Sequence, residues 1–251
     1  MRRIGTAGWS IPRAFADRVP GGGTHLQRYA QRLNAVEINT SFYRSHRPST
    51  WARWAAAVPE NFRFAVKLPR TITHQARLVE CDALIATFAG EVAGLGDKRG
   101  PLLVQLPPSF AFPGDIAGRF FDSVDRLLGG QIVIEPRHAS WYVPEVDAML
   151  DGRGIARVLA DPPVPEAARE PGGWRGLTYI RLHGTPRVYW SAYAPAALDA
   201  LAARIADWAA QGEVWTIFDN TASGAALGNA LDLELPGAPA EGAQSHERNG
   251  E

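Results

Sequence analysis

Short apolar runs alternate along the chain with longer stretches in which apolar residues recur every three to four positions. The runs are rich in Val, Ile, Leu and Phe, which is typical of strands buried in a parallel sheet. Strands are predicted at residues 3–7, 36–39, 62–68, 102–106, 132–135, 156–160, 178–182 and 214–218. Amphipathic helices are predicted at residues 24–33, 49–58, 82–95, 115–128, 144–150, 195–211 and 224–231.

This alternation predicts a parallel sheet covered by helices. Eight strands in a chain of 251 residues favour closure, so the expected fold is an α/β, TIM-barrel-like (β/α)₈ barrel. Residues 161–176 depart from the pattern because they contain four prolines, which argues against a full helix. We expect a degenerate sixth crossover there, or a loop over the mouth. One domain is predicted over residues 1–235, followed by a disordered tail, rich in Gly, Ala, Pro and charge, at 236–251.

Composition narrows the classes of protein. Lys and Arg together number 26, as do Asp and Glu, and this zero net charge argues against a sequence-independent nucleic-acid binder. Cys81 is the only cysteine, which excludes an intrachain disulfide and a cysteine-rich metal site. No apolar segment is long enough to span a membrane, and residues 1–10 do not have the pattern of a signal peptide, so the cytoplasm is the expected compartment.

Polar residues gather at the carboxyl ends of the predicted strands, where barrel proteins place their sites. From the second strand to the eighth they are Glu37 and Asn39; Lys67, with Arg70 and His74 beyond it; Gln105; Glu135 and Arg137; Asp161; Arg181 and His183; and Asp219 and Asn220. Residues two apart on a strand share a face, so each pair is expected to point the same way. Buried charges must be paired, bind a ligand or reach water.

Two interpretations of this mouth stay open. Four acids and four bases can satisfy one another as a network of ion pairs, with no ligand. Alternatively, the arginines can bind a phosphate or carboxylate in a bidentate manner. Aromatic residues near the strand ends would then supply flat walls: Trp9, Phe42, Tyr43, Trp141 and Trp190.

An ordered set of segments resembles the YecE-like family, also known as domain of unknown function 72. They are residues 5–10 (GTAGWS), 35–43 (AVEINTSFY), 62–74 (FRFAVKLPRTITH), 103–108 (LVQLPP), 133–141 (VIEPRHASW), 179–184 (YIRLHG) and 218–220 (FDN). The resemblance implies a TIM-barrel-like fold without assigning an activity. A similarity of the family's pocket to metal-dependent barrel nucleases acting on DNA has been suggested. The family's recurrent polar positions fall on Glu37, Asn39, Tyr43, Lys67, His74, Gln105, Glu135, Arg137, Asp161, His183 and Asn220.

The first hypothesis is an enzyme acting on a phosphorylated or other anionic substrate. The catalytic candidates are Glu37 or Glu135 as general base, His183 as general acid or base, and Asp161. The substrate-binding candidates are Asn39, Tyr43, Lys67, Arg70, His74, Gln105, Arg137, Trp141, Arg181 and Asn220. No Gly-x-Gly-x-x-Gly or P-loop motif indicates a nucleotide cofactor. The expected partner is a small anionic ligand, and the sequence does not indicate an oligomeric state.

Two alternatives remain. In a metal-dependent hydrolase or nuclease, a divalent ion would be held by Glu135, Asp161, His183 and Asp219. Arg137 and Arg181 share strands with two of these ligands and would oppose a cation. In a non-enzymatic binder of nucleic acid or of a metabolite, the contact surface would be formed by Arg44, Arg47, Arg53, Arg70 and Arg77, with stacking on Phe42, Tyr43, Trp51 and Trp54. Trp51 and Trp54 are three apart on a predicted helix and are expected to face the core instead. Cys81 is expected to be a buried, inert thiol.

Overall fold

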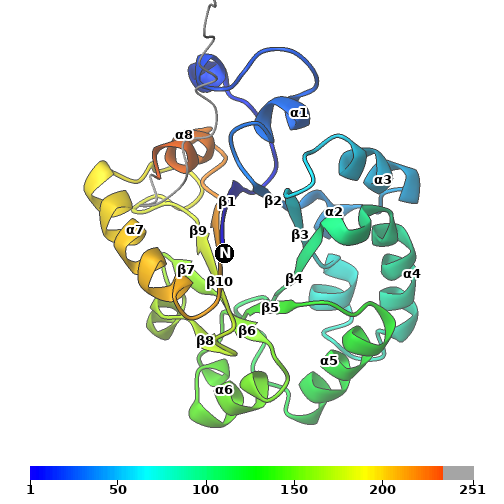
Figure 1. Cartoon of the computed structure of the whole chain (residues 1–251). Helices are drawn as coiled ribbons and strands as arrows, with labels where there is room; N and C mark the ends of the chain where they lie inside the picture. The colour runs from blue at the N-terminus through cyan, green and yellow to red at the C-terminus, as the bar shows by residue number, and fades with distance from the viewer. Residues whose placement is uncertain (234–251) are drawn as a thin grey trace, which may run out of the picture.

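The computed structural model describes residues 1–233, in which strands and helices alternate as the sequence predicts. Figure 1 shows the strands grouped around a centre with the helices outside them. The strands are β1 (Arg2–Thr6), β2 (Ala35–Ile38), β3 (Arg63–Lys67), β4 (Arg99–Gln105), β5 (Ile132–Glu135), β6 (Ala156–Arg157), β7 (Leu159–Asp161), β8 (Gly172–Gly173), β9 (Leu177–Leu182) and β10 (Glu213–Phe218). The expected tail at residues 236–251 lies outside the described residues.

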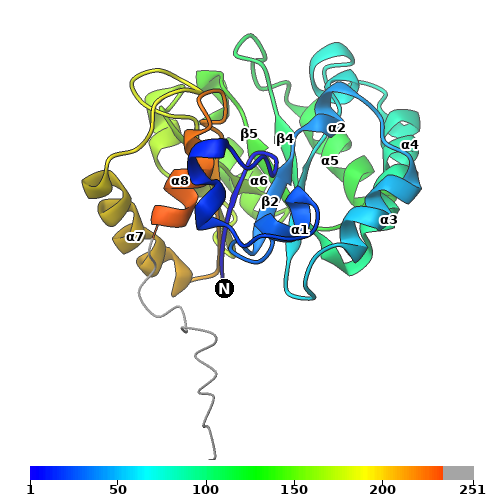
Figure 2. The ribbon, with the colours of Figure 1, turned by 90° about the horizontal axis from the view of Figure 1, so that it is seen from above.

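The helices form the outer layer, and Figure 2 shows α7 on one side of the strands with α3 and α4 on the other. They are α1 (His25–Tyr29), α2 (Thr40–Tyr43), α3 (Pro48–Ala56), α4 (Asp82–Val92), α5 (Asp115–Leu127), α6 (Pro144–Asp151), α7 (Pro195–Ala209) and α8 (Ala225–Asp232). Short 3₁₀ turns lie at Arg13–Arg18, Ala93–Lys98, Ala139–Trp141 and Glu166–Arg169, and a π-helical turn at Thr71–Gln75. Among residues 1–233, no helix has the length and apolar character needed to cross a membrane.

The strands form two sheets, with the orders β1-β10-β9-β7 and β2-β3-β4-β5-β6-β8. Every pairing is parallel except that of β8, which runs antiparallel to β6. The sheets adjoin at two places. A parallel bridge joins Ala7 to Glu37, and the Gly8 amide donates to the Glu37 carbonyl at 2.9 Å. On the other side, only Val158 separates β6 from β7, and its amide donates to the Ile134 carbonyl at 2.9 Å.

Side chains on the two faces of the strands pack into two apolar layers. One face packs against the helices; on α5, for example, Phe120, Phe121 and Val124 are buried. The other face packs within the sheets and forms a smaller core: Ala35, Ala65, Leu103, Val133, Ala156, Val158, Leu177, Tyr179, Trp215 and Ile217. The rings of Tyr179 and Trp215 stack there, with centroids 5.9 Å apart. This inner core lies directly beneath the polar residues of the mouth, because those residues follow its members by two positions.

The sixth predicted strand is interrupted. Residues 156–160 were expected to form one strand, and the structure instead has β6 pairing with β5 and β7 pairing with β9. The strand passes from one sheet to the other at Val158, so no single register covers the whole apolar run. An apolar run alone does not report such a change of partner.

The proline-rich segment is a degenerate crossover, as expected. It contains only the short 3₁₀ turn Glu166–Arg169 and then strand β8, which pairs with β6 through Ala156–Gly173 and Arg157–Gly172. The end of this segment therefore lies against β6 rather than over the mouth. Prolines remove backbone donors and fix φ, which explains the absence of a long helix.

Gly5 on β1 allows the close approach of β1 to β2. A Cβ atom at this position would overlap the carbonyl group of Ala35. We expect Gly5→Ala to reduce the free energy of unfolding by about 1–3 kcal/mol, because the backbone would have to move apart. Urea unfolding measures the change. Gly90→Ala is the matched control, since Gly90 is exposed on α4 and nothing lies near its Cβ position, and it is expected to be neutral or slightly stabilising. Equal effects of the two substitutions would contradict this role of Gly5.

Candidate functional site

A layer of polar side chains covers the inner apolar core at the carboxyl ends of the strands. Each member lies two positions beyond an inner-core residue, so it points to the same side of its strand. The pairs are Ala35 and Glu37, Ala65 and Lys67, Leu103 and Gln105, Val133 and Glu135, Tyr179 and Arg181, and Ile217 and Asp219. The period of two that predicted a shared face in the sequence therefore brings six strands to one polar centre.

Arg181 is the centre of this layer, and its side chain has no exposed surface. Its Nε and Nη2 donate to Glu37 at 3.0 and 2.7 Å, its Nη1 donates to Glu135 at 2.6 Å, and Nη2 also donates to Asp219 at 2.8 Å. The guanidinium thus compensates three carboxylates at once. Burial alone would lower the pKa of Arg181, but the carboxylates raise it well above its ordinary value.

Glu135 is the acid with the most partners. Besides Arg181, it accepts from the Gln105 amide at 3.0 Å and from Nε and Nη2 of Arg137 at 3.1 and 2.9 Å. Burial raises the pKa of Glu135, but the charges of Arg181 and His183 hold it well below its usual value. The carboxylate is therefore ionised at neutral pH and held in one orientation.

His183 lies between two carboxylates. Its Nδ1 is 3.1 Å from an oxygen of Asp219, and its Nε2 is 3.3 Å from an oxygen of Glu135. The second contact does not have hydrogen-bond geometry, so Nε2 is buried without a partner among residues 1–233. Burial lowers the pKa of His183, but the carboxylates of Glu135 and Asp219 outweigh it and raise the pKa above its ordinary value. The two carboxylates thus favour the protonated form of the imidazole.

Lys67 reaches the same layer from β3. Its Nζ donates to the Gln105 side-chain carbonyl at 2.6 Å and lies 4.2 Å from the centre of the Phe42 ring. His74 packs edge-on against the same Phe42 ring, with the two ring centroids 4.9 Å apart. Burial, and then the charge of Arg181, lower the pKa of Lys67 to about 8. Burial and the nearby Lys67 lower the pKa of His74 as well.

Arg137 is the guanidinium of the central network that solvent can reach, with 25 % of its side chain exposed. Two of its nitrogens donate to one oxygen of Glu135, and Nη1 donates no hydrogen bond within residues 1–233. Burial lowers the pKa of Arg137, but the charge of Glu135, with a smaller contribution from the neighbouring Tyr189, raises it. Arg70 and Tyr43 are exposed at the rim, Tyr43 with 72 % of its surface. These groups, with Lys67 and His74, are the predicted binding residues that a ligand can reach from solvent.

Several predicted site residues have other roles. Trp141 is fully buried and donates from Nε1 to the Phe110 carbonyl at 3.0 Å, so it packs the core and does not wall the mouth. Asn220 donates to the Ser191 carbonyl and to Asn229, both at 2.9 Å, and so anchors the loop after β9 to α8. The sequence shows a tryptophan and an amide near strand ends, but it does not show their direction.

Glu37 and Asp161 were expected to be catalytic, and the structure satisfies both within the protein. Glu37 has no exposed surface and accepts from Arg181 and from the Tyr179 hydroxyl, at 2.8 Å in the latter case. It is therefore not accessible as a general base. Asp161 accepts from Tyr193 at 2.6 Å and from Thr185 at 3.0 Å, which fixes the loop after β9. Asn39 is half-buried, and its Oδ1 has no partner among the described residues.

Two tyrosines of this region were not predicted. Tyr179 supports Glu37 from the inner core, and its place two residues before Arg181 is a signal that could have found it. Tyr189 packs edge-on against His183, with ring centroids 5.6 Å apart. It lies in the loop after β9 with φ of +67°, and no pattern in the sequence indicates this contact.

The residues of the alternative metal site are not arranged around an open position. Arg181 bonds to Glu135 and Asp219, and Asp161 bonds to Tyr193 and Thr185. Within residues 1–233, no group of three or more His, Cys, Asp or Glu side chains has an arrangement that could hold a metal ion. The guanidinium of Arg181 occupies the position between Glu135 and Asp219.

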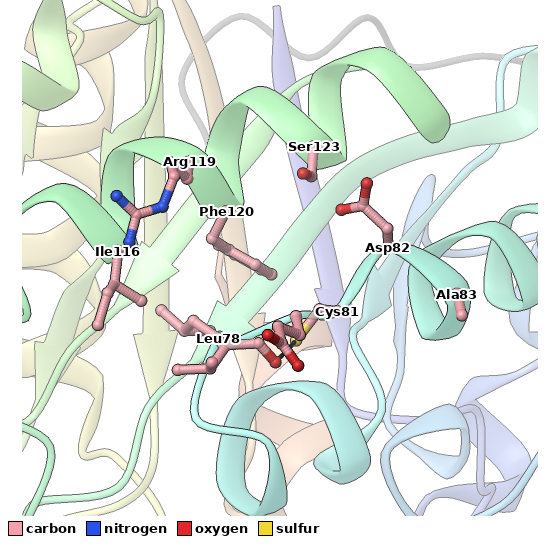
Figure 3. Close-up of a pocket in the computed structure, with 10 residues that line it drawn as sticks. Leu78, Cys81, Asp82, Ala83, Ile116, Arg119, Phe120 and Ser123 are labelled. Atoms are coloured by element: carbon pink, nitrogen blue, oxygen red, sulfur yellow. Dashed lines mark hydrogen bonds between the residues drawn. The ribbon is translucent and has the colours of Figure 1, made fainter.

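A separate surface pocket of about 640 Å³ lies between the start of α4 and α5 (Figure 3). Leu78 and Cys81 face Ile116, Phe120 and Ser123 across it. Cys81 is buried, as expected, and burial raises the pKa of its thiol. No residue of the polar mouth lines this pocket.

The protein has an α/β fold in which parallel strands carry a polar mouth at their carboxyl ends. A family model described as "Protein of unknown function DUF72" matches residues 3–245, and the chain belongs to this family. The UPF0759 protein YecE of Escherichia coli K12 is 34% identical over 176 residues, which are 67% of this chain and 62% of that protein. YunF of Bacillus subtilis 168 is 23% identical over 206 residues, 76% of this chain and 72% of that protein. The match to YecE thus spans about six tenths of its length.

Solved structures agree with this assignment. A DUF72 protein of Enterococcus faecalis V583 has a TM-score of 0.79 and 25% identity, covering 93% of this chain and 94% of that one. A DUF72 protein of Thermotoga maritima MSB8 has a TM-score of 0.75 and 22% identity, with coverages of 93% and 97%. D-Psicose 3-epimerase of Clostridium cellulolyticum H10, solved with D-tagatose, has a TM-score of 0.51 at 11% identity, with coverages of 92% and 89%. The Thermotoga maritima protein and the epimerase, at 22% and 11% identity, show only that their fold is similar to that of this chain.

We expect Arg181→Met to reduce the free energy of unfolding by about 3–5 kcal/mol at neutral pH, because it leaves three buried carboxylates without their cation. The loss should shrink on acidification, since the carboxylates are then protonated and need no counterion. Urea unfolding at neutral and at mildly acidic pH tests both statements. Arg157→Met is the matched control, because buried Arg157 pairs with one half-exposed carboxylate, Asp147. An Arg181→Met loss that is no larger than the control, or that does not vary with pH, would contradict the network.

The raised pKa of His183 predicts a pH-dependent contribution to stability. A raised folded-state pKa stabilises fully below the unfolded value of about 6.5, and this stabilisation disappears as pH rises through the folded pKa. The difference in unfolding free energy between wild type and His183→Gln should therefore be larger near pH 6 than near pH 9. Denaturant titrations across this range measure it, with exposed His25→Gln as control. A difference that grew with pH would show that the folded state favours the neutral imidazole.

Proposed function

We propose that the polar mouth is the active site of an enzyme acting on a small anionic substrate whose phosphate or carboxylate group is held by Arg137. The main support for this proposal is Nη1 of Arg137, which donates no hydrogen bond within residues 1–233. In the central network of these residues, Arg137 is the only guanidinium that is partly exposed to solvent and keeps such a donor. Arg181, which was expected to bind the anion, is excluded from this role by its three carboxylates. An anion at Arg137 would add the acceptor that this guanidinium lacks.

Proton transfer in this proposal belongs to His183. Within residues 1–233 its Nε2 is buried without a hydrogen-bond partner, and its Nδ1 is held by Asp219. Burial lowers its pKa, but Glu135 and Asp219 raise it above the ordinary value, which favours the protonated form that a general acid needs. Glu135 orients Arg137 and stabilises the imidazolium. Glu37 takes no part in the chemistry, since both of its oxygens accept from protein donors and it has no exposed surface, and Asp161 has a structural part, since Tyr193 and Thr185 both donate to its Oδ2. The electrostatic arrangement is formed before a substrate arrives, which favours catalysis over simple binding.

The similarity in fold to D-psicose 3-epimerase supports a small-molecule substrate for the mouth. That protein was solved with D-tagatose, a ketose sugar. The argument is an analogy at the level of fold and transfers no residue. We also propose that the two sheets close into one eight-stranded barrel, with β6 and β7 as its sixth strand. The bridge from Ala7 to Glu37 and the contact of Val158 with Ile134 support this closure.

We expect phosphate to raise the melting temperature of the protein and Arg137→Gln to abolish this rise. A ligand present at about 100 times its Kd stabilises the folded state by about 2.7 kcal/mol, which a thermal-shift assay detects readily. Arg204→Gln is the matched control, because it removes an exposed guanidinium that is paired with Glu170 on the outer surface. If phosphate, sulfate and small carboxylates all leave wild type unchanged, or stabilise Arg137→Gln equally, the anion site is not at Arg137.

A further inference from the structure

The chain uses lysine very sparingly. Of its 26 basic residues, 24 are arginine and only Lys67 and Lys98 are lysine. Lys98 has a structural explanation: its Nζ donates to the carbonyls of Ala55 and Val58, at 3.0 and 2.7 Å, and so caps the carboxyl end of α3. Arginine and lysine are not interchangeable where a compact or titratable amine is required. The second lysine lies in the polar mouth.

Lys67 is held there without a carboxylate partner. Its Nζ hydrogen bonds to the neutral Gln105 side chain and packs on the Phe42 ring, and it forms no ion pair within residues 1–233. Only 7 % of the residue is exposed, so the amine is largely dehydrated but not sealed off. An arginine here would remain charged at every accessible pH, whereas a dehydrated lysine beside another cation can lose its proton. With a pKa of about 8, about one tenth of Lys67 is the free amine at pH 7, far more than an ordinary lysine has.

We propose that Lys67 is a nucleophile that forms a Schiff base with the carbonyl carbon of a small anionic aldehyde or ketone bound at the mouth. The proposal rests on the proposed function for one point, the binding of the anionic group at Arg137. It adds the substrate class, a carbonyl compound, and a covalent step. Gln105 directs Nζ, and Phe42 provides an apolar wall that keeps the amine poorly hydrated.

The step balances without any oxidant or reductant. The unprotonated Nζ attacks the carbonyl carbon, the π electrons move to oxygen, and a proton passes from nitrogen to that oxygen. The carbinolamine then expels its hydroxyl group, which takes up a second proton and leaves as water, and a C=N bond forms. The protonated imine carries the same charge as the original ammonium. His74, which shares the Phe42 ring with Lys67 and whose pKa is lowered, is the nearby neutral base for these proton transfers.

Reductive trapping tests the proposal. The purified protein is incubated with glyoxylate or dihydroxyacetone phosphate and then reduced with borohydride, and the modified peptides are identified by mass spectrometry. Because the chain has two lysines and one α-amine, each site gives a separate peptide. We expect Lys67 to be labelled at least about tenfold faster than Lys98 at neutral pH, since a pKa near 8 gives far more free amine than an ordinary lysine has. The labelling rate should rise with pH and level off above about pH 8.

Two variants serve as controls. Lys67→Arg keeps the charge and should lose the label, while Lys98→Arg should keep it on Lys67. Should Lys67→Arg fail to fold, the ratio of the two lysines within wild type still decides the matter. Labelling that is confined to Met1 and Lys98, or equal on both lysines, would overturn the proposal.

The same experiment separates this inference from the proposed function. Phosphate should compete with the anionic carbonyl probes, and the competition should be lost in Arg137→Gln. Phosphate stabilisation without any adduct on Lys67 would overturn the Schiff base and leave the anion site intact. An adduct on Lys67 that forms equally well with uncharged acetaldehyde and is insensitive to phosphate would support the nucleophile and contradict the anion site.

Discussion

Three carboxylates and one guanidinium meet at the carboxyl ends of the strands, where they are largely buried from water, and the mouth depends on their mutual compensation. Arg181 bonds to Glu37, Glu135 and Asp219 at distances between 2.6 and 3.0 Å. The three acids come from β2, from β5 and from the residue after β10, so one side chain ties together strands that are far apart in the sequence. Taking such charges out of water costs several kcal/mol each, and only close geometry offsets that cost.

This compensation divides the mouth into an inner and an outer part. The inner part, centred on Arg181, is satisfied by the protein itself, as the ion-pair interpretation of the sequence expected. The outer part is less fully satisfied: within residues 1–233, Nη1 of Arg137 donates no hydrogen bond, Nε2 of His183 has no hydrogen-bond partner, and Nζ of Lys67 bonds only to a neutral amide. The ion-pair interpretation therefore holds for the inner part, and ligand binding at the outer part is what we propose. The inner network holds the outer groups in place, because Glu135 contacts Arg181, Arg137 and His183.

Much of the fold was predictable because its signals are local. Alternating apolar runs and amphipathic stretches located the strands and helices, and the period of two within each strand correctly grouped Glu135 with Arg137 and Arg181 with His183. The sixth strand was predicted wrongly as continuous, because the change of partner at Val158 depends on the neighbouring strands and not on the strand's own residues. The direction of Trp141 was wrong for a similar reason: a tryptophan after a strand packs wherever the adjoining helices leave space.

By itself the sequence determined which residues reach the carboxyl ends of the strands, because side-chain direction follows from strand periodicity. It also determined that Lys67 is one of two lysines among 26 basic residues. Only the tertiary structure decided which charges neutralise one another and which remain available, because that depends on distances between strands of the two sheets, as between Glu37 and Arg181, 144 positions apart. The position of each glutamate decided its role, since the nearest donors differ. Glu37 is bonded only to buried donors, Tyr179 and Arg181, whereas Glu135 also holds the partly exposed Arg137 in place.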